Sequence, residues 1–192
     1  MQDLKFIFLD RDGVINVEKE LLHKKSDMEL IPQSAEAIRL LNENDHKVII
    51  ITNQPVIARG LCTLEELAEI HKYMEALLAE KNARIDRIYF CPHHPTVGNN
   101  SFYTRKCECR KPKPGLIFQA QKEFNIKNLS ECFMIGDKIA DIKTGFLAGC
   151  KTILVETGYG GNEGFNDAVP DYKAKDLYDA VTNIILKNEA LN

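Results

Sequence analysis

Asp10 and Asp12 stand directly after an apolar run, Phe6 to Leu9, and are separated by one residue. Because side chains in a strand repeat with a period of two, both carboxylates leave the end of this run toward the same region. Two carboxylates in one small space repel each other unless a cation lies between them or one is protonated. A hard cation such as Mg²⁺ would satisfy the pair, leaving Asp10 as a nucleophile toward phosphorus and Asp12 to handle the leaving-group proton. Taken alone, the two residues fit a strand that runs into an acidic loop equally well.

Polar side chains also follow two other apolar runs. They are Thr52, Asn53 and Gln54 after residues 48–51, and Asp137 and Lys138 after residues 132–135. The carboxyl ends of parallel strands meet at one edge of a sheet, and ligands of open α/β sheets bind there. Singly, Thr52 is as consistent with a helix cap and Asp137 with a turn. Together with Asp10 they supply the nucleophile, metal ligands and donors that phosphoryl transfer requires, so Asn53 and Gln54 are predicted to bind substrate.

A cation for the phosphoryl oxygens is expected from Lys111, which lies in the run RKPKPG. The prolines at 112 and 114 restrict the backbone around this lysine and would hold it in place. Viewed alone, the segment fits a solvated surface lysine. Lys138 is a weaker candidate for the same task and is predicted to contact substrate.

Three of the six cysteines are clustered, as CPH at residues 91–93 and CEC at residues 107–109. The predicted zinc ligands are Cys91, His93, Cys107 and Cys109. A Cys₃His set leaves no coordination position for water, so this Zn²⁺ would be structural. Free thiols are the alternative, and His94 could replace His93 as the ligand. The remaining cysteines stand among apolar neighbours and are expected to be small buried hydrophobes, without disulfides.

The length of the chain suggests one domain, residues 1–192. Its charge balance gives no sign of a basic surface that would bind polyanions. The chain has 25 basic and 28 acidic residues, for a net charge of -3. This balance favours neither nucleic acid nor an anionic membrane surface as a partner. The N-terminal residues show no targeting pattern, and no apolar stretch approaches the roughly 20 residues of a membrane helix. We therefore expect a cytoplasmic monomer that acts on a small molecule.

The rhythm of the chain predicts an α/β fold. Short apolar β-rich runs alternate with segments of helical spacing, as in parallel βαβ units. A capping-box signature, Thr63 with Glu66, opens one of the helices. The predicted strands are 6–9, 48–51, 88–90, 132–135 and 152–155, and the predicted helices are 34–42, 63–81, one from 114 or 115, one after 137 that ends near 149, and 177–187. Residues 92–114 and 158–170 lack periodicity and are expected to be functional or mobile loops.

Five separated motifs in this order resemble the signature series of the haloacid dehalogenase superfamily. They are DRDGVIN, TNQ with IARG, CPH with CEC, RKPKPG and GDKIADIKTGFLAG, spread over residues 6 to 155. More narrowly, the series is similar to that of the zinc-containing D-glycero-D-manno-heptose 1,7-bisphosphate phosphatases, with the histidinol-phosphate phosphatases as nearest relatives. The resemblance implies a doubly wound, mostly parallel, Rossmann-like sheet without a cap domain, in which the zinc-pinned loop shapes the substrate entrance.

The resemblance also implies a role for each matching residue. Asp10 would be the nucleophile, forming an aspartyl-phosphate, and Asp12 the general acid and then base. Mg²⁺ would be held by Asp10, Asp137 and the main-chain carbonyl of Asp12. Thr52 and Lys111 would steady the phosphoryl group, and Arg110 would recognise the rest of the substrate. The implied reaction is removal of the 7-phosphate from the heptose bisphosphate, in nucleotide-heptose biosynthesis.

Two departures concern the loops that would contact the sugar. Family members usually read TNQSGIARG, where this chain has Pro55 and Val56. The segment after DGVIN usually carries a glycine and a tyrosine, where this chain has Glu20 and Leu21. The chemistry is expected to be intact and the sugar preference to be open. The alternatives are a histidinol-phosphate phosphatase, a polynucleotide 3′-phosphatase, which the net charge disfavours, and a retired zinc-binding interaction module.

Overall fold

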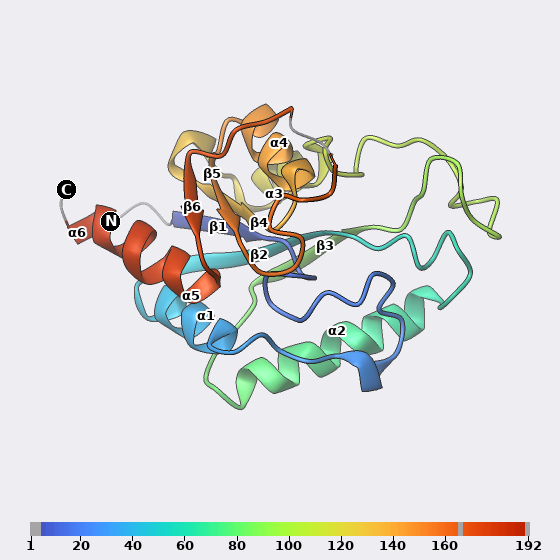
Figure 1. Cartoon of the computed structure of the whole chain (residues 1–192), viewed down its shortest axis with the longest axis horizontal. Coiled ribbons are helices and arrows are strands. Elements are labelled where there is room, and N and C mark those ends of the chain that lie inside the picture. The colour runs from blue at the N-terminus through green and yellow to red at the C-terminus, as the bar shows by residue number, and fades with distance from the viewer. Residues whose placement is uncertain (1–4, 165–166, 191–192) are drawn as a thin grey trace.

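The computed structural model describes residues 5–164 and 167–190 and contains a six-stranded parallel sheet (Figure 1). The strand order is β3-β2-β1-β4-β5-β6. The strands are β1 (Lys5–Leu9), β2 (His46–Asn53), β3 (Arg87–Cys91), β4 (Phe133–Gly136), β5 (Lys151–Val155) and β6 (Tyr172–Ala174). The order reverses between β1 and β4, so these two strands flank the switch point at which such sheets bind ligands.

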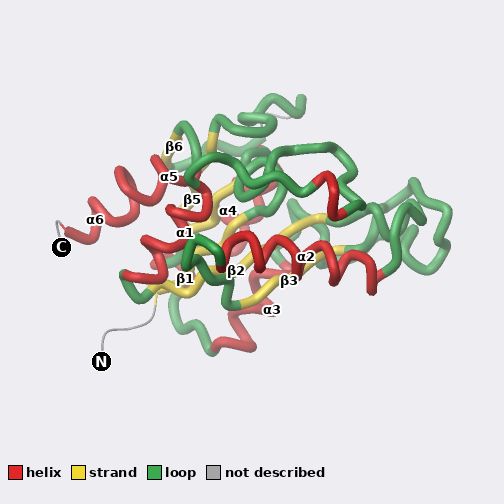
Figure 2. Tube along the Cα trace, turned by 90° about the horizontal axis from the view of Figure 1, so that it is seen from below, coloured by secondary structure: helices red, strands yellow, loops and turns green. Residues whose placement is uncertain are grey.

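Helices cover both faces of the sheet (Figures 1 and 2). One layer contains α1 (Ser34–Glu43), α2 (Leu64–Ala79) and a C-terminal helical stretch made of α5 (Leu177–Asp179), a π-helical segment (Ala180–Ile185) and α6 (Leu186–Ala190). The other contains α3 (Gly115–Phe124) and α4 (Ile139–Ala148). This is the predicted doubly wound α/β fold.

Two hydrophobic cores explain why the strands read as continuous apolar runs. In β2, Val48 and Ile50 pack into the core shared with α1 and α2, whereas Ile49 and Ile51 pack into the core shared with α3. All four are fully buried. A strand buried on both faces needs apolar residues at every position, which places the first polar residue, Thr52, at the end of the strand.

The predicted elements agree with the structure apart from their ends. The five predicted strands are present, and the Thr63 side chain accepts from the Glu66 N–H to complete the capping box of α2. Gly149 ends α4 in the left-handed conformation. Strand β6 was not predicted, because three residues give too little periodicity. Within the described ranges, the helices are all too short or too polar to cross a membrane.

Candidate active site and metal centre

A buried ion cluster lies at the carboxyl ends of β1 and β4. The Lys111 Nζ lies 2.9 Å from Asp10 Oδ1 and 2.6 Å from Asp141 Oδ1, and its side chain is 3% exposed. Burial alone would lower the pKa of Lys111, but the negative charges of Asp10 and Asp141 outweigh it and raise that pKa. The ammonium therefore remains charged at neutral pH, beside the predicted nucleophile Asp10. Asp141, in the first turn of α4, joins the cluster although it was not among the predicted site residues.

The carboxylates of Asp10, Asp137 and Asp141 form a donor set suited to a hard cation. Their ligand oxygens lie within 4.8 Å of one another, and all three residues are buried. Among the described residues, Asp137 Oδ1 has no hydrogen-bond partner. Burial, followed by the charges of Asp10 and Asp141, raises the pKa of Asp137 to about 8. A divalent cation would remove this electrostatic penalty, so the residues fit Mg²⁺.

Two glycines shape the space around Asp137. Gly13 and Gly158 have φ of +80° and +62°, and a Cβ on either would overlap the Asp137 carboxylate. The backbone N–H of Tyr159 donates to Asp137 Oδ2 at 2.8 Å, which fixes the orientation of the carboxylate. Side chains are excluded from both positions, so backbone approaches closely enough to enclose the acid.

Asp12 is held by three donor residues, two from its own loop and one from the end of β2. Arg11 donates from Nε and Nη2, Asn16 donates to Oδ1 at 2.9 Å, and Gln54 donates to Oδ2 at 2.9 Å. Burial would raise the pKa of Asp12, but the Arg11 charge and these hydrogen bonds hold it below its ordinary value. Arg11 and Asn16 were not predicted as site residues, although both stand within the motif DRDGVIN.

The polar residues at the end of β2 serve the cluster in different ways. Thr52 lines the cleft, and its Oγ1 accepts from Gln54 Nε2 at 3.0 Å. Asn53 accepts from the Lys111 N–H at 3.0 Å and donates to the Lys111 carbonyl at 3.2 Å, so it clamps the backbone of that lysine. Gln54 is buried and contacts Asp12. In this structure Asn53 and Gln54 position other site residues, and Asn53 also lines the cleft.

A cleft of about 540 Å³ opens onto the cluster. Its charged lining residues besides those already described include Glu18, Glu20, Arg59, Arg110 and Lys138. The Lys138 ammonium donates to Glu18 Oε2 at 2.7 Å and lies 4.4 Å from the centroid of the Tyr159 ring. Glu20, at one of the two sequence departures, has φ of 57°, the left-handed region that favours glycine.

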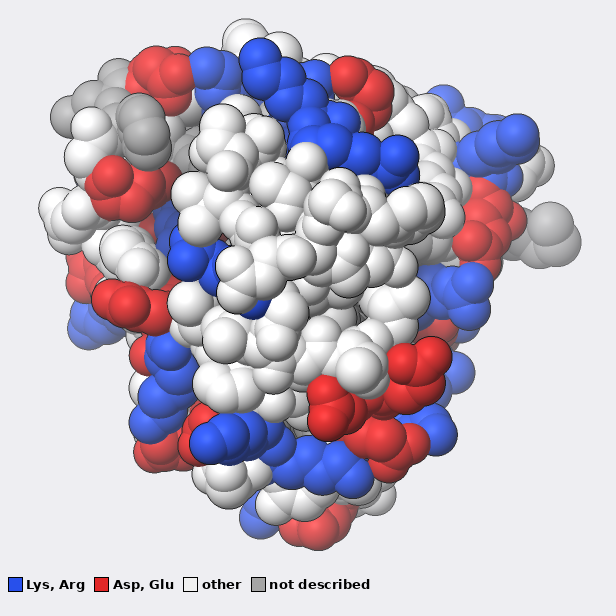
Figure 3. Space-filling view, turned by 90° about the vertical axis from the view of Figure 1, so that its right-hand side faces the viewer, with Lys and Arg blue, Asp and Glu red and all other residues white. Residues whose placement is uncertain are grey.

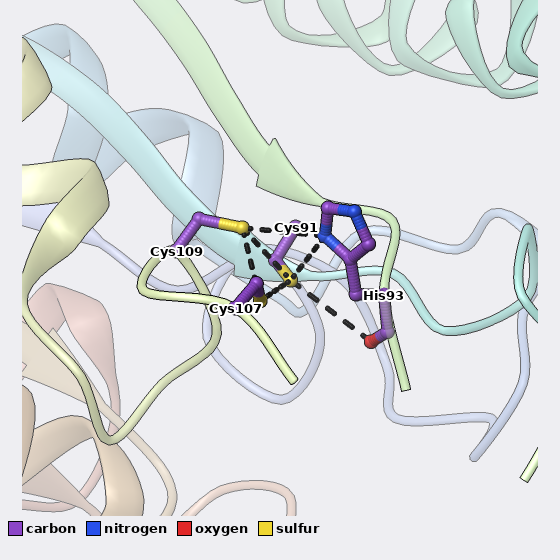
Figure 4. Close-up of side chains that lie close together, drawn as sticks. All are labelled: Cys91, His93, Cys107 and Cys109. Carbon is purple, nitrogen blue, oxygen red and sulfur yellow. Dashed lines mark hydrogen bonds between the residues drawn. The ribbon is translucent and has the colours of Figure 1, made fainter. Parts of the chain in front are cut away.

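The cysteine cluster is assembled as predicted (Figure 4). The Cys109 Sγ lies 3.2 Å from that of Cys107 and 3.3 Å from that of Cys91, and His93 Nδ1 lies 3.4 Å from Cys109 Sγ. Tetrahedral ligands about 2.3 Å from a zinc ion would lie about 3.8 Å apart, slightly further than these. The contacts with Cys91 and then with Cys107 lower the pKa of Cys109 to about 5, so the cluster favours a thiolate. The residues present therefore fit Zn²⁺.

His94 is used elsewhere. Its Nδ1 accepts from the backbone N–H groups of Thr96 and Val97 at 3.3 and 2.8 Å, and it lines the cleft. The cluster contains His93 alone of the two histidines. The choice between them, which the sequence left open, is therefore made by the loop after β3.

Comparisons with known proteins place this chain among phosphatases. Residues 108–180 match a family model described as HAD-hydrolase-like. The chain is 40% identical over 158 residues to the D-glycero-beta-D-manno-heptose-1,7-bisphosphate 7-phosphatase of Yersinia pestis, covering 82% of this chain and 83% of the relative. It is 38% identical over 195 residues to the D-glycero-D-manno-heptose-1,7-bisphosphate 7-phosphatase of Chlorobaculum tepidum, covering 97% and 96%.

A crystal structure of similar fold agrees with these relatives. It is that of D,D-heptose 1,7-bisphosphate phosphatase from B. bronchiseptica complexed with magnesium and phosphate. The TM-score is 0.83 at 31% sequence identity, over 96% of this chain and 99% of that one.

Proposed function

This chain belongs to the heptose 1,7-bisphosphate 7-phosphatase family of HAD-like hydrolases, and from that premise we propose that it removes the 7-phosphate through an aspartyl-phosphate on Asp10. The observation that carries the proposal is the buried cluster in which Lys111 contacts both Asp10 and Asp141 at the floor of a cleft. Positive charge fixed beside a nucleophilic carboxylate stabilises the charge that develops on a transferring phosphoryl group.

The proposed reaction has two steps. In the first, an Asp10 carboxylate oxygen bonds to phosphorus as the bond from phosphorus to the sugar oxygen breaks, and Asp12 gives its proton to that oxygen. In the second, water attacks phosphorus, Asp12 takes a proton from the water, and the bond to Asp10 breaks to release phosphate. Lys111 and Thr52 donate to the non-bridging oxygens. The dianionic substrate raises the pKa of the nearby Asp12, which favours the protonated acid needed for the first step.

Mg²⁺ is proposed to be held by Asp10, Asp137 and the main-chain carbonyl of Asp12, with Asp141 completing the acidic set. When bound, the ion offsets the charge of the carboxylates and of the phosphoryl oxygens. The magnesium and phosphate named for the B. bronchiseptica enzyme support this assignment. The glycines at 13 and 158 keep the space around Asp137 free of side chains.

A structural Zn²⁺ is proposed at Cys91, His93, Cys107 and Cys109. The zinc site would also fix Arg110. This arginine directly follows Cys109, and its Nη1 donates to the His93 carbonyl at 3.0 Å. Zinc binding and the placement of a substrate-facing guanidinium are therefore coupled. This coupling supports a role for the loop in shaping the substrate entrance.

The second phosphate of the substrate is proposed to bind Arg59 and Arg110. Both line the cleft, and the Nε of Arg59 is buried without a partner among the described residues. Burial, and then the charges of Arg110 and Arg59, lower the pKa of His94, which indicates a positive potential at this wall. A bisphosphate would supply the missing negative charge.

The other candidate functions fit these observations less well. Histidinol phosphate carries an amine in place of the second phosphate, and a positive cleft wall disfavours it. A retired zinc module would have no use for the buried cluster of Asp10, Lys111 and Asp141. On the face toward which the loops after β2 and β3 project, charged side chains lie mainly around the rim of an uncharged area (Figure 3). The Lys and Arg side chains on this rim stand beside Asp and Glu side chains, and the net charge of -3 disfavours a polynucleotide.

We further propose that residues 1–192 act as one domain, as a monomer, in the cytoplasm, with a phosphorylated sugar as the partner. The net charge of -3 supports a small-molecule substrate over a polyanionic partner. Light scattering of the purified protein with and without Mg²⁺ tests the monomer. A mass twice that of the chain would contradict it.

The test of the function is a substrate panel under saturating Mg²⁺. It contains both anomers of heptose 1,7-bisphosphate, heptose 7-phosphate and histidinol phosphate. We expect the highest kcat/KM for one bisphosphate anomer, and an Arg59→Ala variant that loses at least tenfold more on the bisphosphate than on the monophosphate. Equal kcat/KM for histidinol phosphate would contradict the proposed substrate, and turnover by Asp10→Asn would contradict the nucleophile.

A further inference from the structure

Arg11, between the two aspartates, is a buried cation with two partners. Arg11 is fully buried. Its Nε and Nη2 donate to the Asp12 carboxylate at 2.8 to 3.2 Å, and its Nη1 lies 3.2 Å from Nε2 of His71. One edge of the guanidinium thus faces the candidate acid and base, and the other faces a side chain from a different element. A planar fork held at both edges has little freedom to rotate.

His71 lies on the buried side of α2 and is 6% exposed. Its ring packs edge to face against Phe90 of β3, with centroids 5.8 Å apart. Burial and then the Arg11 charge lower the pKa of His71 to about 3, so the ring is neutral at working pH. A neutral imidazole can accept a hydrogen bond at Nε2, and the Arg11 Nη1 that faces this atom can only donate one.

The carboxylate of Asp12 receives its orientation from these contacts. Asn16 and Gln54 each supply one further donor, to different oxygens. Of these three donor groups, the guanidinium alone contacts both oxygens, so it defines the plane of the carboxylate. That guanidinium depends in turn on an acceptor 60 residues away in the chain.

We propose that His71 and Arg11 are positioning residues: His71 holds the Arg11 guanidinium in place from α2, and Arg11 sets the orientation in which Asp12 transfers protons. The inference rests on the acid and base role of Asp12 in the proposed function. Outer-shell partners that orient metal ligands contribute roughly 10- to 100-fold to affinity or activity, and we expect an effect of that size from these two residues.

The basicity of the leaving group distinguishes a positioning role of His71 toward Asp12 from a role in packing alone. A sugar alkoxide or a phenolate needs a proton as its bond to phosphorus breaks, whereas p-nitrophenolate is stable without one. The value of kcat/KM reports the steps up to release of the leaving group, in which Asp12 is the acid. A misoriented Asp12 should therefore slow alkyl and phenyl phosphates much more than p-nitrophenyl phosphate.

The experiment compares His71→Leu, His71→Gln and Leu78→Ala with the unmodified protein on a sugar phosphate, phenyl phosphate and p-nitrophenyl phosphate. We expect His71→Leu to lower kcat/KM about 10- to 100-fold on the first two and less than about threefold on p-nitrophenyl phosphate. His71→Gln keeps an acceptor and should recover most of the loss. Leu78→Ala changes another buried residue of the same helix. It should leave the ratio of kcat/KM on phenyl phosphate to kcat/KM on p-nitrophenyl phosphate unchanged.

Two outcomes would overturn the proposal. One is an equal loss by His71→Leu on all three substrates, which would indicate packing alone. The other is no loss on the sugar and phenyl phosphates. The variant Asp12→Asn distinguishes a failure of the premise: if it does not itself steepen the dependence on leaving-group basicity, Asp12 is not the acid, whatever the His71 variants do.

Discussion

Replacing Lys111 with methionine should have opposite effects on turnover and on Mg²⁺ affinity. The ammonium contacts Asp10 at 2.9 Å and Asp141 at 2.6 Å at the floor of the cleft, where the lysine side chain is 3% exposed. Removing one preorganised donor to a developing charge costs roughly 10²- to 10³-fold in kcat, or about 3 to 4 kcal/mol. The same change removes a positive charge that competes for the carboxylates, so Mg²⁺ should bind at least about tenfold more tightly.

The substitution should also destabilise the metal-free protein. Breaking a buried ion pair leaves unpaired charge and costs about 3 to 5 kcal/mol. For a domain of this size that corresponds to a fall of about 6 to 20 °C in the thermal midpoint. Saturating Mg²⁺ should recover part of this loss, because the cation replaces the missing positive charge.

The assays are steady-state phosphate release, a Mg²⁺ titration followed by calorimetry, and thermal scans with and without Mg²⁺. Lys113→Met is the matched control, since Lys113 pairs with Glu108 at the surface, where its side chain is 48% exposed. We expect the control to match the unmodified protein in all three assays. A Lys111→Met protein that keeps turnover within fivefold, or that binds Mg²⁺ more weakly, would refute the electrostatic reasoning.

Three further predictions follow from the same geometry. Asp10→Asn should lower turnover at least 10³-fold while the protein keeps its circular dichroism spectrum and its zinc; retained turnover would rule out the nucleophile. Elemental analysis should find one tightly held zinc per chain, and a chelator should expose residues 91–109 to proteolysis before the domain unfolds; a stoichiometry near zero would remove the zinc site. The pKa values of Asp137 and Asp141, raised to about 8 and about 6 from an ordinary 3.8, predict that the metal-free protein loses stability as the pH rises from about 4 to about 8, with the Asp141 contribution lost by about pH 6 and that of Asp137 by about pH 8. Because the folded state holds these protons more tightly than the unfolded chain, Mg²⁺ should raise the thermal midpoint more at pH 9 than at pH 6, and a larger effect at pH 6 would contradict the cluster.

Some features of the candidate site depend only on residues that are close together in the sequence. Asp10 directly follows a buried strand, and Asp12 lies two residues later. Both positions were therefore predictable from the apolar run and from the two-residue repeat of side chains in a strand. The cluster of three cysteines and one histidine was also predictable, because two short pairs of possible ligands bracket one loop. Membership of the family was also evident, since five motifs occur in one order along the chain.

The partners of those residues were not predictable in the same way. Asp141 stands in the sequence as an acidic residue four positions after Asp137, and its contact with Lys111 depends on how the first turn of α4 lies against the loop before α3. His71 has the pattern of a buried helical residue, which gives no sign that its ring faces Arg11. Gln54 stands beside the predicted donor Thr52, yet it turns to Asp12.

The sequence by itself determined the fold class, the family and the groups available for chemistry, because strand period, capping signals and motif spacing all act over a few residues. Tertiary structure alone decided how those groups are paired. It brought Lys111 to two acids, His71 to Arg11 and His93, rather than His94, to the three thiols. The physical reason is that a buried charge takes whichever partner the packed elements bring within hydrogen-bond distance, and no local spacing specifies that partner.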